Sequence, residues 1–179
     1  MNIFEAIKNR HSFRGSYKNT KVPREDLKKI LEAGLAAPSG CNKQTTSLIA
    51  IDDPQLVNSI HALVKKNGFR GEGGVAPAGI CVLTQEIPIK ENKYLNVQDY
   101  SAAIENMLLA ITALGYASCW IEGQVTANTE TQNQISELLG VPADYIVVGF
   151  LPVGVAENEV KRPEYKSFNE RAWFNRFGK

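Results

Sequence analysis

The chain has 179 residues, of which 44% are apolar, and this suffices for the core of one domain. Its 20 basic and 19 acidic residues give a net charge of +1 without a long run of one sign. That balance excludes the broad positive surface of a nucleic-acid or anionic-membrane binder, so a basic ligand site must be local. The amino end does not read as a leader and no apolar run is long enough to span a membrane, so we expect a cytoplasmic protein.

The first half of the chain predicts three helices and two strands. Asn2 and Glu5 form a capping pair for a short helix that ends near Asn9, and Pro23 begins a second helix that Pro38 closes. Apolar residues at helical spacing and β-branched runs define the other elements. The predicted helices after the first are 23–35 and 53–64, and the predicted strands are 47–51 and 78–84.

The second half continues the alternation. The segment 97–114 is apolar almost all round, which predicts a helix buried on several sides and ended by Gly115. A further helix is predicted over 129–139, and strands over 116–121 and 145–153. We therefore expect one α/β layered domain with a central sheet of four or more strands flanked by helices. The connections 68–79 and 87–96 are loops, and either could be a lid or a dimer contact.

The last segment, residues 155–179, is charged but rich in aromatic side chains. A free terminus does not normally expose so much aromatic surface to water. We predict that this segment is an arm that packs on another subunit. The aromatic residues are Tyr165, Phe168, Trp173, Phe174 and Phe177.

Two short segments carry the chemistry. In an extended stretch from Arg10 to Arg14, the side chains of Arg10, Ser12 and Arg14 share one side and can surround a phosphate. Alternatively, Arg10 and His11 complement the carboxyl end of the first helix dipole. The stretch from Pro38 to Gln44 places small residues and side-chain amides after a helix end, which suits a planar polar ligand, although such residues are also ordinary in turns.

These segments resemble the Arg-x-Ser-x-Arg/Lys and Pro-Ser-x-x-Asn-x-Gln motifs of the flavin-dependent nitroreductases. The resemblance continues, in the family's order, through Asp99 to Asn106 and Leu114 to Gly123. The chain departs from the family where Thr45 and Thr46 replace a frequent Pro-Trp, and where 67–74 offers only Asn67 and Arg70 as guesses for contacts to the ring edge.

The resemblance implies a three-layer α+β fold with a central mixed, mainly antiparallel sheet. It also implies an obligate homodimer with FMN in two interfacial clefts. NADH or NADPH would give hydride to flavin N5, and a nitroaromatic or quinone would then take it by a ping-pong mechanism. No dedicated acid or base is required, because the cofactor performs the chemistry. The backbone N–H of Glu122 or Gly123 would face N5.

The same resemblance assigns the cofactor contacts. Arg10, Ser12 and Arg14 would hold the phosphate with His11 beside the ribityl chain or ring; Pro38, Ser39, Asn42 and Gln44 would touch the flavin of the neighbouring subunit; Trp120, Ile121, Glu122 and Gly123 would line the ring; and Lys161 and Arg162 would reach the phosphate.

Several alternatives remain open. Trp120 and Ile121 would equally suit the core, and Lys161 and Arg162 would equally suit a solvated surface, since adjacent side chains in an extended chain diverge. A non-catalytic FMN-binding redox sensor or flavin carrier is the other function, and enone reduction or reductive dehalogenation are other reactions. No metal site or dinucleotide fingerprint is predicted: the histidines do not cluster, and Gly71 to Gly74 lacks the required strand and helix.

Overall fold

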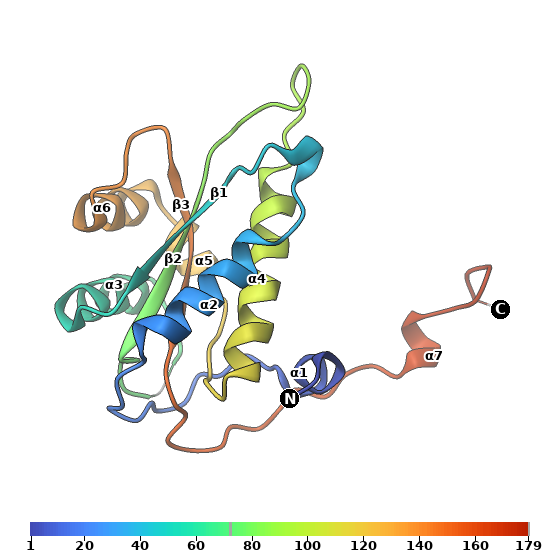
Figure 1. Ribbon diagram of the computed structural model, residues 1–179, viewed down its shortest axis with the longest axis horizontal. Coiled ribbons are helices and arrows are strands. Elements are labelled where there is room, and N and C mark those ends of the chain that lie inside the picture. Colours follow the sequence, from blue (N-terminus) through green and yellow to red (C-terminus); the bar gives the residue numbers. More distant parts are fainter. Residues whose placement is uncertain (72, 179) are drawn as a thin grey trace.

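The computed structural model describes residues 1–71 and 73–178, and its centre is an antiparallel sheet in the order β1-β2-β3 (Figure 1). The central strand β2 is buried along its whole length, which agrees with its continuous apolar sequence. An irregularity between Val82 and Leu83 shifts its register against β3. The strands are β1 (Thr46–Ile51), β2 (Ala78–Thr84) and β3 (Ile146–Val153).

Helices cover both faces of the sheet. Because side chains alternate along β2, Ile80 and Val82 join the core on one side, while Cys81 and Leu83 join the core on the other. The predicted three-layer α+β arrangement is therefore confirmed. The first face is covered by α2 (Arg24–Leu35) and α4 (Asn96–Ala113), and the second by α3 (Pro54–Lys66), α5 (Gly123–Thr126) and α6 (Thr129–Leu139).

Local capping explains where the helices begin. Helix α1 (Ile3–Asn9) has the predicted capping box of Asn2 and Glu5. The side chain of Asp53 accepts from the first free N–H groups of α3. Helix α2 begins one residue later than predicted, because Pro23 is its N-cap, whereas α6 begins at Thr129 as predicted, with Asn128 as its N-cap.

The predicted strand 116–121 is not a strand. It touches the sheet only at isolated bridges, Ala117 to Gly154 and Ile121 to Phe150. Between them, the carbonyl of Ser118 accepts from the backbone N–H of Phe13 at 2.8 Å. This segment therefore divides its hydrogen bonds between β3 and residues 10–14, so in the described part of the chain the sheet has three strands, and the expectation of four or more is wrong.

The carboxyl-terminal segment leaves the body of the molecule (Figure 1). Residues 155–158 first pair with residues 16–18, and the chain then runs outward to α7 (Phe168–Arg171). Phe174 and Phe177 are 78% and 83% exposed, so this chain alone does not cover them. Packing of 155–179 on a partner remains a prediction. Among the described residues, no helix is long and apolar enough to cross a membrane.

Candidate functional site

Residues 10–14 form an extended segment that follows α1. Phe13 anchors it, because its ring is buried and its backbone N–H bonds to Ser118. Arg10 closes α1 by donating its backbone N–H to Ala6. His11 and Phe13 line one cavity and Arg14 lines another, while neither has Arg10 or Ser12 in its wall. That Arg10, Ser12 and Arg14 face one phosphate remains a prediction.

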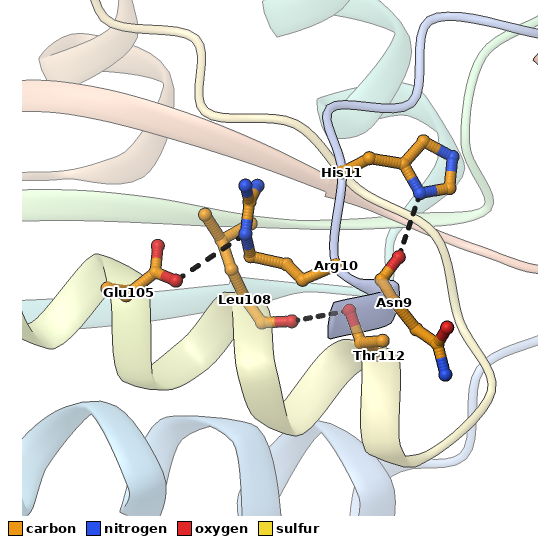
Figure 2. Close-up of polar contacts among 6 residues, drawn as sticks. All are labelled: Asn9, Arg10, His11, Glu105, Leu108 and Thr112. Carbon is orange, nitrogen blue, oxygen red and sulfur yellow. Dashed lines mark hydrogen bonds and ion pairs between the residues drawn. The ribbon is translucent and has the colours of Figure 1, made fainter. Parts of the chain in front are cut away.

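Figure 2 shows that Arg10 and His11 point in different directions. The Nε atom of Arg10 lies 3.4 Å from Oε1 of Glu105 on α4, and the Arg10 side chain is 23% exposed. The Nδ1 atom of His11 lies 2.9 Å from the carbonyl oxygen of Asn9, at the carboxyl end of α1. His11 thus lies at the carboxyl end of α1, where it can complement the helix dipole. Among the described residues Arg10 instead makes a loose ion pair, which a stronger anion can replace.

The carboxyl-terminal segment brings Arg162 to the same region. Its pairing with residues 16–18 places Nη1 of Arg162 3.4 Å from Oδ1 of Asn9. A cavity of about 490 Å³ lies here, with His11, Asn158 and Arg162 in its wall. The neighbouring Lys161 is exposed and does not line this cavity. The structure therefore brings Arg162 beside Asn9, 153 residues away in sequence, and into the wall of the cavity that His11 lines.

The second motif is held by a buried carboxylate at the amino end of α4. Asp99 is 5% exposed and accepts from the backbone N–H of Gly40 and the hydroxyl of Thr45, both at 2.8 Å. Within the loop, Oγ of Ser39 accepts from the backbone N–H of Gln44 at 3.0 Å. The loop 38–45 is thus tied at its start, middle and end before any ligand arrives.

This loop contains an unusual backbone. Cys41, Asn42 and Gln44 have φ angles of 51°, 54° and 49°, in the left-handed region that favours glycine. Each such residue costs of order 1–3 kcal/mol, and residues of this kind concentrate at ligand sites. Pro38, Ser39 and Gln44 line a cavity of about 200 Å³, while Asn42 is exposed beside them. The two motifs therefore line separate cavities toward opposite ends of α4.

The segment 120–123 combines core packing with free backbone donors. Ile121 is buried and exchanges two hydrogen bonds with Phe150, and Trp120 packs on the core beside α4. Oε1 of Glu122 accepts from the hydroxyl of Tyr100 at 2.9 Å. Within the described residues, the backbone N–H groups of Glu122 and Gly123 have no acceptor, and the space above Gly123 is open. These two donors are available to a ligand.

Sequence reasoning missed the residues that hold these segments. Asp99 and Tyr100 begin α4, and each reaches a different predicted contact segment. Asn67, proposed for the ring edge, instead donates its side-chain amide to the carbonyl of Gln124 at 2.8 Å and to Oγ1 of Thr131 at 2.7 Å. The available signal was Asp99 and Tyr100 within the first two turns of a helix that the sequence predicts to be buried on several sides, because buried polar groups require partners.

Burial dominates the ionisation of the nearby groups. It raises the pKa of Tyr100 to about 12, and the adjacent Glu122 carboxylate adds to this shift. It also raises the pKa of the Cys119 thiol to about 11, against the opposing charge of Arg14. Both groups are therefore neutral at physiological pH. The described residues contain no group of three or more His, Cys, Asp or Glu that could hold a metal ion.

The chain belongs to the Nitroreductase family, whose model matches residues 7–74 and 74–155. A protein of Archaeoglobus fulgidus with the provisional name NADH dehydrogenase/NAD(P)H nitroreductase is 32% identical over 80% of this chain and 79% of its own length.

Solved structures agree with this assignment. An FMN-dependent nitroreductase from Clostridium difficile matches with a TM-score of 0.79 and 28% identity, over 97% of this chain and 99% of the other. A nitroreductase with bound FMN from Bacteroides fragilis matches with a TM-score of 0.72 and 29% identity, over 93% and 96%.

Proposed function

We propose that this protein is an FMN-dependent oxidoreductase that transfers hydride from NADH or NADPH to a small acceptor such as a nitroaromatic or a quinone, with donor and acceptor binding in turn. The observation that carries the proposal is the pair of unpartnered N–H groups at Glu122 and Gly123, on an open turn at the position that the family resemblance assigns to flavin N5. The FMN named for the two solved nitroreductases supports the same cofactor.

The donor set fits a flavin mononucleotide. Arg10, Arg14 and Arg162, with the hydroxyl of Ser12, supply the forked cations and the neutral donor that a phosphate dianion prefers. Arg10 would exchange its 3.4 Å contact with Glu105 for the phosphate. Bound FMN would supply hydride acceptance and donation, whereas the chain binds it, orients the ring and presents backbone donors.

We propose that the complete site needs two copies of the chain. His11 and Phe13 line one cavity and Pro38, Ser39 and Gln44 line another, so one flavin that touches both motifs would take one motif from each copy. Apolar side chains on α1 and α2 support such an interface, because Phe4 and Leu35 are 79% and 61% exposed. The arm 155–179 would then cover the partner.

The proposal has a direct test. Freshly purified protein should show the visible absorption of bound flavin, and initial rates with varied NADH and menadione should give parallel double-reciprocal lines. A protein that binds FMN but oxidises no NADH or NADPH with menadione would be the sensor or carrier. A colourless protein that does not take up added FMN contradicts both.

A further inference from the structure

The turn Glu122–Gln124 is held from two directions by side chains of distant elements. Tyr100 reaches it from α4 and Asn67 from the end of α3. We propose that Tyr100 and Asn67 form a clamp that positions the backbone donors of Glu122 and Gly123, and that this clamp controls the rate at which the bound flavin is reduced. The inference rests on the proposed function.

The first half of the clamp is rigid. Tyr100 is 5% exposed and packs in the core with Ile104 and Met107, so its ring has little freedom. Its hydroxyl donates to Oε1 of Glu122 at 2.9 Å in a part-buried bond. Burial keeps the hydroxyl protonated, and therefore donating, until the pH approaches 12. The Glu122 side chain thus has a fixed point of attachment.

The second half of the clamp joins three helices. Asn67 is the C-cap of α3, and its amide nitrogen donates both to the carbonyl of Gln124 and to Oγ1 of Thr131, which is 5% exposed. Thr131 lies in the first turn of α6, whose N-cap, Asn128, accepts from the Thr131 backbone. One side chain therefore ties α5 to both α3 and α6.

Helix α5 requires such support because it is very short. It has only Gly123–Thr126, and its N-cap Glu122 makes no side-chain capping bond. A single turn is unstable alone in water, so its orientation must come from tertiary contacts. Catalytic donors lose effect steeply when displaced, and a shift of about 1 Å can cost on the order of a hundredfold in rate. The clamp opposes that displacement.

The test compares Tyr100→Phe and Asn67→Ala with the wild type. Gln85→Ala is the control, because it also deletes a side-chain amide bond, of 2.7 Å to Asp144, and Gln85 lines neither cavity of the proposed site. The first readout is amide hydrogen exchange measured by NMR. We expect on the order of tenfold faster exchange at the bonded amides of Val125 and Thr126 in the two clamp variants, with the sheet strands unchanged.

The second readout is stopped-flow reduction of the holoprotein at saturating NADH. We expect the rate constant to fall on the order of tenfold in both clamp variants. The FMN dissociation constants of the clamp variants should remain within twofold of the wild-type value. The control variant should keep both its reduction rate constant and its FMN dissociation constant within twofold of wild type. Exchange and reduction rates within twofold of wild type in Tyr100→Phe would overturn the proposal, as would faster exchange throughout the chain. Since Tyr100→Phe removes one oxygen atom, it decides the matter if Asn67→Ala does not fold.

The two levels of inference fail differently. If the protein binds no FMN, the proposed function is wrong, and with it the role of the clamp in flavin reduction. If FMN binds and is reduced at wild-type rates in both clamp variants, the proposed function stands and only the clamp is wrong.

Discussion

The two predicted contact segments differ in what would bind the ligand: charged side chains in one and a fixed backbone conformation in the other. Residues 10–14 rely on long charged side chains, and among the described residues Arg10 has a single ion pair, which is loose and partly exposed. The loop 38–45 relies on backbone shape, because a buried carboxylate binds it at both ends and three residues adopt left-handed φ angles. A phosphate can be reached by flexible cations, whereas a flat ring needs surfaces already in place.

This difference predicts how each segment responds to change. Loss of a charged side chain should weaken FMN binding and leave folding intact. Loss of a loop anchor should damage the fold itself, because the anchor is buried. If substitutions in residues 10–14 and in the loop 38–45 have the same effects on FMN binding and on folding, this distinction between the two segments is wrong.

The largest effect is expected from removal of residues 171–179, which tests whether both segments belong to one site. The truncation deletes three of the arm's aromatic side chains, so we expect dimers to give way to monomers or aggregates and FMN to be lost. Light scattering after size-exclusion chromatography and the flavin spectrum measure both. A truncated protein that remains an intact dimer refutes the arm hypothesis.

Asp99→Ala should have the next largest effect. It leaves the buried hydroxyl of Thr45 and the part-buried N–H of Gly40 without an acceptor, which should cost about 3 kcal/mol in the free energy of unfolding. Urea denaturation measures this cost. Asp144→Ala is the control, because it removes an exposed carboxylate bonded to Gln85 and should cost less than about 0.5 kcal/mol. Equal costs for the two variants would show that the loop is not anchored by Asp99.

Arg10→Ala tests the charged segment. A lost charge-assisted contact to phosphate is worth about 1.5–3 kcal/mol, which corresponds to roughly 10- to 150-fold weaker FMN binding. Flavin fluorescence titration gives the dissociation constant, and urea denaturation should show nearly unchanged stability. Arg24→Ala, which breaks the exposed pair with Asp52, is the control and should bind FMN normally. Unchanged flavin occupancy after dialysis of Arg10→Ala contradicts the phosphate assignment.

The smallest effect concerns the reactivity of two cysteines. Cys41 is exposed in the loop, so bound FMN should slow its alkylation by iodoacetamide a few-fold at pH 8. Cys119 should not react there, because a pKa of about 11 leaves roughly 0.1% as thiolate. Mass spectrometry of labelled peptides measures the alkylation rate of each cysteine. If FMN does not change the alkylation rate of Cys41, the loop does not lie beside the flavin ring.

Much of the fold followed from local patterns. The capping box of Asn2 and Glu5, the Asp53 cap and the apolar spacing of α4 are short-range signals, and the structure contains all of them. The segment 116–121 was misjudged because its β-like composition reflects burial. Whether a buried extended segment joins a sheet depends on its neighbours, and here residues 10–14 take one of its carbonyls.

The sequence by itself determined the family motifs, the layered class and the candidate ligand contacts, since these depend on residue type and spacing. Only the tertiary structure decided that Arg162 lies beside Asn9, that Asp99 holds the loop and that Tyr100 and Asn67 hold the turn at Glu122. The reason is physical: a buried polar group must find a partner, but the chain can supply that partner from any distance along the sequence.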